Sequence, residues 1–353
     1  MFRAITLTAT EERHSPGRGI TGIIALKRLL ATLLFAGLMG HNAAAEVSEV
    51  RFARMQGLGY LQLYLLDDLK LVEKHSRDSG DAITSRVIPL NQPTAVIDAL
   101  LSGGADFGVA GITPFITLWD KTLGNLNVRA LAALNSQPAF LNSSNPNVKS
   151  IRDFTESDRI ALPAVKVAYQ ATILQMAAEQ AFGRYDRLDT QTVGLAHPDA
   201  AAALLSGKSE ITAHFTSPPF QYQELADPRI HKVLSSYDVT GGPATFSGIF
   251  STRKFHDENP RAVRAVLAAL QEANDIIRAE PHRAAEIYVR LDHARQSVEE
   301  VEALLKDPDI QYTITPQNIT KYTDFMARVG TIGKRPETWK DLFFPEIYAL
   351  PGT

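Results

Sequence analysis

The segment Gly57-Leu58-Gly59 is the part of the sequence that comes nearest to a known chemical signature. It follows a strand-like stretch and precedes a helical one, and Asp78 and Asp81 lie further along the chain. A Rossmann dinucleotide site uses this arrangement, with glycines under the pyrophosphate and an acidic residue on the ribose. However, Leu61 and Gln62 stand where the third glycine should be. We therefore expect no nucleotide cofactor.

The other residue types that carry chemistry match no catalytic or metal-binding pattern. The sequence lacks the patterns G-x-S-x-G, G-x-x-x-x-G-K-[ST] and H-E-x-x-H. There is no cysteine, which excludes a disulfide framework, a thiolate zinc site and a cysteine nucleophile. The histidines are scattered, and His282 and His293 have no ligand spacing. We expect neither catalytic residues nor a metal site, and no cofactor.

Two segments 104 positions apart repeat one pattern. Residues 99–115 read ALLSGGADFGVAGITPF, and residues 203–220 read ALLSGKSEITAHFTSPPF. Each copy predicts the end of a helix, a glycine at which the helix stops, a short strand, and a proline that opens the next helix. Two such units predict two α/β lobes built to one plan, with a ligand held between them.

The elements around these segments alternate between strands and helices. We predict strands at 47–54, 84–89, 106–110 and 128–134, with helices at 60–74, 94–102 and 114–120 between them, as in a parallel open sheet. The loop 135–146 is expected to cross to a second lobe, with a strand at 159–162, a helix at 167–182 and the second repeat. Residues 241–243 are expected to return, before a strand at 247–251 and several helices. Lobe 1 is thus 46–138 plus 244–353, and lobe 2 is 139–243.

The first 45 residues have the features of a cleaved export signal. Lys27 and Arg28 precede the apolar run 29–39, and Ala43-Ala44-Ala45 stands before Glu46. The run is too short to span a membrane. These 45 residues carry five of the 36 basic and two of the 39 acidic side chains, so the remainder has a net charge of about −6. We expect a periplasmic protein that does not bind nucleic acid.

The order of motifs along the chain resembles that of a known family. The motifs are A-L-x-S-G-x-A-D-F-G-V-A-G-x-x-P (99–114) and G-I-F-S-T-R-K-F-x-x-x-N-P-x-x-V-x-A (248–265). Residues 47–345 resemble the periplasmic substrate-binding proteins of ABC importers for nitrate, alkanesulfonates and taurine, whose relatives also bind thiamine-precursor pyrimidines. The resemblance implies an α/β, type II-like periplasmic binding protein with two lobes, a central cleft and two hinge crossings.

The resemblance also implies a function. It predicts a monomer that captures a small-molecule ligand, specifically a small organic anion, and delivers it to the membrane permease of an ABC importer. Two alternatives remain open: an enzyme of thiamine-precursor pyrimidine metabolism on the same fold, and a subunit that presents ligand to a sensor.

In that family the ligand contacts come from loops that face the cleft. Helix N-termini in those loops present unpaired N–H groups and the positive end of the helix dipole, which suit an oxyanion. Carried onto this chain, the expected contacts are Gln56, Gly57, Tyr60, Gly111, Ile112, Thr113, Pro114, Asn135, Lys166, Val167, Ala168, Tyr169, His214, Phe215, Thr216, Thr240 and Thr245.

One position departs from the family pattern. Many relatives have a glycine and two hydroxyl residues before the long helix of lobe 2, whereas this chain has the segment 163–169, Pro-Ala-Val-Lys-Val-Ala-Tyr. No hydroxyl group precedes the helix there, and Lys166 close to a helix start opposes the helix dipole. We therefore predict that Lys166 contacts an anionic ligand. Tyr60, Tyr169 and Phe215 would suit a ligand with an apolar or aromatic body.

Overall fold

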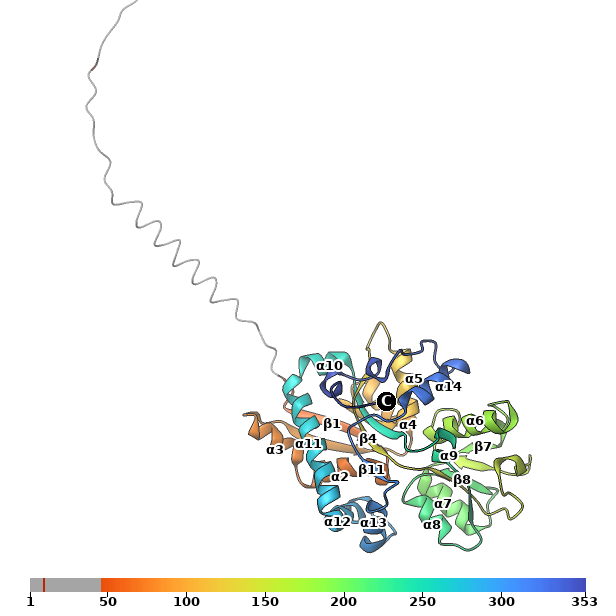
Figure 1. Cartoon of the computed structure of the whole chain (residues 1–353). Helices are drawn as coiled ribbons and strands as arrows, with labels where there is room; N and C mark the ends of the chain where they lie inside the picture. The colour runs from red at the N-terminus through yellow and green to blue at the C-terminus, as the bar shows by residue number, and fades with distance from the viewer. Residues whose placement is uncertain (1–8, 10–45) are drawn as a thin grey trace, which may run out of the picture. The chain divides into compact units, whose positions relative to one another are not determined.

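The computed structural model describes residue 9 and residues 46–353 of the chain. Within residues 46–353 the strands form two sheets, and helices pack around both (Figure 1). The first sheet has six strands in the order β11-β4-β10-β3-β1-β2, and the second has five in the order β7-β6-β8-β5-β9. The export signal expected over residues 1–45 lies outside the described residues, apart from Ala9.

The first sheet contains both parallel and antiparallel strands. Its strands are β1 (Glu49–Arg54), β2 (Thr84–Pro89), β3 (Phe107–Gly111), β4 (Arg129–Ser136), β10 (Thr245–Ser251) and β11 (Gln311–Tyr312). β1 pairs in parallel with β2 and β3, but β10 runs antiparallel between β3 and β4. The prediction of a parallel sheet is therefore confirmed for β1, β2 and β3, but the complete sheet is mixed. The strand that returns from the second sheet inserts at the centre of the first, which the spacing of apolar residues cannot reveal.

The helices that accompany the first sheet pack on it or on one another. They are α2 (Leu61–Asp68), α3 (Leu71–Asp78), α4 (Pro93–Leu101), α5 (Ile112–Lys121), α10 (Arg253–Glu258), α11 (Pro260–Ala279), α12 (Pro281–Asp292), α13 (Val298–Leu305) and α14 (Ile319–Arg328). The single helix expected at 60–74 is divided, because Lys70 adopts a left-handed conformation with φ of 51° between α2 and α3. Along α11 the apolar residues recur every three or four positions and are buried, as an amphipathic helix requires.

The second sheet is formed by the middle of the chain. Its strands are β5 (Phe140–Ser143), β6 (Ile160–Leu162), β7 (Thr192–Gly194), β8 (Ala213–Thr216) and β9 (His231–Ser235), and its helices are α6 (Tyr169–Phe182), α7 (His197–Ser206), α8 (Phe220–Leu225) and α9 (Ser236–Thr240). Half of the expected crossing loop 135–146 is strand, since β4 extends to Ser136 and β5 spans Phe140–Ser143. The polar composition misled the prediction: Asn142 is buried, and its amide donates to Gln221 and Glu224.

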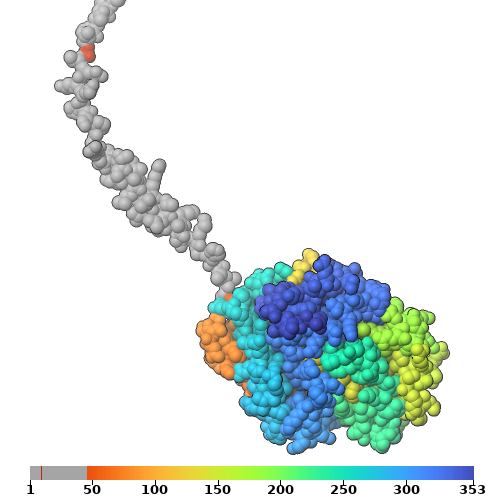
Figure 2. All heavy atoms as spheres, in the orientation of Figure 1, coloured from red at the N-terminus to blue at the C-terminus, as the bar shows by residue number. Residues whose placement is uncertain are grey.

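The chain passes between the sheets twice. Residues 137–139 join β4 to β5, and residues 241–244 join α9 to β10. Gly241 and Gly242 have φ of 72° and 127°, which only glycine adopts without strain. In Figure 2 the C-terminal residues, in blue, lie between α10 and α11, in cyan, and the helices of the second sheet, in green.

The sequence repeat corresponds to a repeated structural unit. The first copy spans α4, β3 and α5, and the second spans α7, β8 and α8. Gly103 and Gly207 both have positive φ at the ends of α4 and α7, as the prediction of a helix stop requires. The prolines differ: Pro114 is the third residue of α5, whereas Pro218 stands before the start of α8.

Candidate functional site

A small cavity lies where the two sheets face each other. We call it the inner cavity. It has room for about one water molecule. Its lining residues are Met55, Tyr60, Pro93, Gly111, Pro114, Pro163, Ala168, Tyr169, Gln170, His197 and Phe246. These residues come from segments that are distant in sequence, and they meet because the carboxyl ends of β1, β3 and β6 point to the same region.

Four helices begin at the inner cavity. They are α4, α5, α6 and α7, whose first turns include Pro93, Pro114, Tyr169 and His197. In none of the four does the N-cap residue accept a hydrogen bond from the helix through its side chain. Side-chain caps are present in α9, α10 and α13, whereas α2, α3, α8, α11, α12 and α14 lack one, as these four helices do. The four helices therefore direct uncapped N–H groups and positive dipole ends toward one place, which favours a negatively charged group there.

Aromatic rings form one wall of the inner cavity. The rings of Tyr169 and Phe246 meet edge to face with centroids 4.9 Å apart, and Tyr60 lies 6.4 Å from Phe246. The hydroxyl of Tyr169 is 3.3 Å from that of Tyr322. Burial raises the pKa of Tyr60 and of Tyr169, so both phenols stay neutral. This wall is apolar and suits the body of an organic ligand.

Two polar side chains, His197 and Gln170, complete the lining. Both are buried, and the ring nitrogen Nε2 of His197 lies 3.3 Å from Nε2 of Gln170. Behind His197, its Nδ1 atom lies 3.0 Å from Nε2 of His214 and 3.0 Å from the hydroxyl of Thr216. Burial and the neighbouring His214 lower the pKa of His197 well below its usual value. His197 is therefore neutral at physiological pH.

Direct contacts join the two sides of the cavity. The backbone N–H of Leu58, before α2, donates to the carbonyl of Pro218, before α8, over 3.2 Å. The buried hydroxyl of Thr172 on α6 donates to that of Thr113 on α5 over 3.1 Å. At Gly111 an added Cβ would lie 3.1 Å from the Cβ of Tyr169. The elements of the two sheets are thus in close contact around the inner cavity, which is a closed arrangement.

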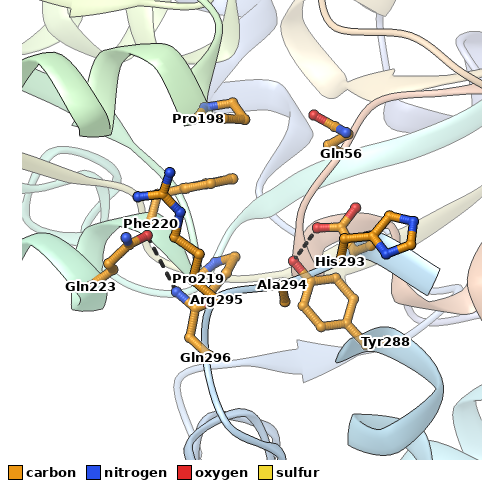
Figure 3. A pocket seen from close by; sticks show the side chains of 11 residues that line it. Gln56, Pro198, Pro219, Phe220, Gln223, Tyr288, His293, Ala294, Arg295 and Gln296 are labelled. Atoms are coloured by element: carbon orange, nitrogen blue, oxygen red, sulfur yellow. Dashed lines mark hydrogen bonds between the residues drawn. The ribbon is translucent and has the colours of Figure 1, made fainter. Parts of the chain in front are cut away.

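A larger groove lies on the outer side of the same segments (Figure 3). It encloses about 620 Å³, including the part open to solvent. Gln56 and Pro198 line this outer groove, while their chain neighbours Met55 and His197 line the inner cavity. On the opposite side the segment 293–296 follows α12, and Gln296 donates to Gln223 over 3.4 Å. The ring of Phe220, which lines the groove, stacks on His197 and separates the two spaces.

The structure brings some of the predicted contact residues to these spaces. Tyr60, Gly111, Pro114, Ala168 and Tyr169 line the inner cavity, and Gln56 lines the outer groove. Gly57 lies where the two sides meet, with φ of 109°, and a Cβ there would come within 3.4 Å of the Pro218 carbonyl oxygen. The loops before α2 and α6 and the end of β3 therefore border these spaces.

The structure does not place the other predicted residues in the cavity lining. Ile112 and Phe215 belong to the hydrophobic core, and Val167 is half-buried beside Ala168. Thr113, Asn135, His214, Thr216, Thr240 and Thr245 are buried, and each has intramolecular partners. Asn135, for example, donates to the carbonyl of Gly59. These polar side chains hold the strands and loops rather than face the cavity.

Lys166 is the clearest difference between expectation and structure. It has φ of 62°, its side chain is exposed, and it does not line the inner cavity. Its left-handed conformation turns the chain immediately before α6, so the side chain leaves the loop on the solvent side. No lysine or arginine lines the inner cavity within the described part of the chain.

The sequence reasoning missed six of the lining residues. These are Met55, Pro93, Pro163, Gln170, His197 and Phe246. Two of them could have been identified from the sequence repeat. Pro93 is the first residue of α4 and His197 is the first residue of α7, so both stand at the start of a repeated helix. The pairing of His197 with His214 corrects the view that the histidines are scattered. Seventeen residues separate them, and only the packing of α7 against β8 brings the rings together.

The described residues contain neither a cluster of three or more side chains suited to a metal ion nor a helix with the length and apolarity to cross a membrane.

Comparison with known proteins agrees with this architecture. No curated protein matches the sequence. The alkanesulfonate-binding protein SsuA from Xanthomonas axonopodis pv. citri, solved with MOPS bound, superposes with a TM-score of 0.68 at 16% identity, over 84% of this chain and 99% of that one. The nitrate-binding protein NrtA from Synechocystis PCC 6803 gives 0.66 at 15% identity, over 84% and 85%. The aliphatic sulphonate-binding protein SsuA from Escherichia coli gives 0.63 at 18%, over 85% and 92%.

At these identities the similarity shows the fold. It confirms that the chain has the same fold as the sulfonate- and nitrate-binding proteins. Residues 44–291, most of the chain, match the model of the NMT1-like family. The chain therefore belongs to the NMT1-like family and has the fold of the periplasmic binding proteins.

Proposed function

We propose that this protein is the ligand-binding component of an ABC importer and that it captures a small organic anion in the inner cavity. The observation that carries the proposal is the meeting of four uncapped helix N-termini at one enclosed point between two sheets. Backbone N–H groups and helix dipoles can hold an anion without a basic side chain. The aromatic wall would contact the apolar body of the same ligand.

Ligand entry requires the two sides of the cavity to separate, because the closed space holds about one water molecule. We propose lobe 1 as residues 46–138 plus 244–353 and lobe 2 as residues 139–243. The two crossings, 137–139 and 241–244, are the segments that would act as hinges. Opening would break the contacts between Leu58 and Pro218 and between Thr113 and Thr172.

The location and partners follow from the same proposal. The solved relatives are named as periplasmic or as binding components of ABC import systems. We propose that this protein is exported, loses residues 1–45, and works in the periplasm as a monomer that delivers its ligand to a membrane permease. We expect it to leave the ligand chemically unchanged.

The test is a thermal-shift screen of the purified protein, followed by calorimetric titration. The probes are nitrate, ethanesulfonate, butanesulfonate and MOPS, with butylammonium as a cation of similar size. An anion that binds should raise the melting temperature by mass action, while butylammonium should not. Small-angle scattering should show a smaller radius of gyration with the bound anion. Preference for butylammonium, or mass-spectrometric evidence that a probe is converted, would overturn the proposal.

A further inference from the structure

Three buried titratable side chains form a chain that ends at the inner cavity. The Oε1 atom of Glu224 on α8 lies 2.5 Å from Nδ1 of His214 on β8. Nε2 of His214 lies 3.0 Å from Nδ1 of His197 at the start of α7. The side chains of Glu224 and His214 have no solvent exposure, and His197 is 7% exposed. A cluster with so little access to water is most stable when its charges are balanced and its polar atoms are hydrogen-bonded.

Charge balance favours two arrangements of the protons on Glu224 and His214 over a third, in which a buried carboxylate faces a neutral His214 whose Nε2 accepts from Nδ1–H of His197. In the first, Glu224 is a carboxylate and His214 is an imidazolium. In the second, the proton lies on Glu224, which donates it to Nδ1 of a neutral His214. Among residues 46–353, the only other polar side chain bonded to Glu224 is Asn142, whose amide donates to Oε2 over 2.9 Å and cannot take up charge. In both arrangements Nε2 of His214 carries a hydrogen and donates it to Nδ1 of His197.

This donor decides which nitrogen of His197 carries its hydrogen. Because Nδ1 accepts from His214, the hydrogen of a neutral His197 must be on Nε2. That nitrogen faces Gln170, which also lines the inner cavity. The oxygen and nitrogen of an amide side chain are assigned from the hydrogen-bond network. The oxygen of Gln170 can therefore be placed toward His197 and accept this hydrogen while the cavity holds no other acceptor.

We propose that the Glu224–His214 pair holds His197 as the neutral Nε2–H tautomer and that this N–H is the hydrogen-bond donor which the cavity offers to its ligand. The part of this proposal that concerns the ligand rests on the proposed function. It specifies a ligand that presents an acceptor atom to His197, such as an oxygen of a sulfonate or a carboxylate, and it disfavours an ammonium group.

The surroundings of His197 keep this donor constant with pH. His214 and the hydroxyl of Thr216 face its Nδ1 atom from β8, Phe220 stacks on it from α8, and Gln170 faces its Nε2 atom from α6. The other titratable groups at the cavity are the phenols of Tyr60 and Tyr169, which are neutral. Protonation of His197 would place a second cation beside His214 or break the bond between them. The N–H of His197 is therefore present as a neutral donor in the range where an ordinary histidine titrates.

Nitrogen-15 NMR of the histidine rings tests the tautomer without any ligand. In the purified protein, Nε2 of His197 should give the signal of a protonated ring nitrogen and Nδ1 that of an unprotonated one, with no titration between pH 5 and pH 8. The variant Glu224→Ala should alter this pattern, whereas an exposed variant, His282→Gln, should leave it unchanged. A hydrogen on Nδ1, or an imidazolium signal at His197 in this range, would overturn the proposal.

Calorimetric titration with butanesulfonate tests the ligand contact. His197→Gln keeps an N–H group near the position of Nε2 and should retain affinity within a few-fold. His197→Phe keeps the ring and its stacking on Phe220 but has no donor, so its affinity should fall about 10- to 100-fold, as expected for a lost hydrogen bond to a charged group. Equal affinities for the two variants would refute the contact. Failure of the wild type to bind any anion would instead refute the proposed function, and the NMR result would still decide the tautomer.

Discussion

Replacing Glu224 with alanine should destabilise the protein by about 3–5 kcal/mol, the usual cost of breaking a buried pair by removing one partner. The side chain of Glu224 has no solvent exposure. Its two oxygens accept hydrogen bonds or share a proton with two partners, Nδ1 of His214 at 2.5 Å and Nδ2 of Asn142 at 2.9 Å.

The magnitude follows from the groups that the substitution leaves behind. Alanine removes the acceptor of both partners, and His214 and Asn142 are fully buried, so water cannot replace it. Each buried donor left unsatisfied costs about 1–3 kcal/mol, and two of them together match the range given above. If His214 is an imidazolium, it must also lose its proton, which adds to the cost.

Urea unfolding followed by far-UV circular dichroism measures this loss. Glu224→Gln is the matched control, because its amide oxygen can accept from Asn142 while its N–H group donates to His214; we expect a smaller loss than for alanine. Glu210 is exposed, and Glu210→Ala should change stability by no more than about 0.5 kcal/mol. A loss below about 1 kcal/mol for Glu224→Ala would show that the buried pair does not form as described.

Three further predictions follow from single positions. Gly59→Ala would place a Cβ 2.7 Å from the ring of Phe246, which lines the inner cavity. It should therefore lower the free energy of unfolding in urea by about 1–3 kcal/mol. The control Gly194→Ala meets only ordinary contacts and should lower it less. Lys166→Ala should bind anions with wild-type affinity in calorimetric titration, because the side chain is exposed; a tenfold loss would restore the contact predicted from the sequence. Burial lowers the pKa of His197, so the unfolded chain binds a proton below pH 6.5 that the folded protein does not. Stability should therefore fall as the pH drops below 6.5, by up to about 1.4 kcal/mol per pH unit from this group, and His197→Gln should remove that part of the slope in urea titrations at pH 7.5 and pH 5.

Local sequence signals determined much of the fold. Apolar spacing located β2, β3, α4 and α6 closely, and the glycines at 103 and 207 marked where α4 and α7 end. The repeat and the order of motifs indicated two similar α/β units and the correct family of folds. These features depend on interactions within a few residues of one another, so the sequence carries them directly.

Long-range packing decided the rest. The insertion of β10 between β3 and β4, the pairing of His197 with His214 and the outward direction of Lys166 each depend on segments that are distant in the chain or on a single backbone conformation. Residue type indicated Tyr60 and Tyr169 as cavity residues, but it could not distinguish them from Phe215, which is buried in the same core and does not line the cavity. A loop or strand turns one side toward a shared cavity when another segment buries its opposite side. That other segment comes into contact with it only when the whole chain packs.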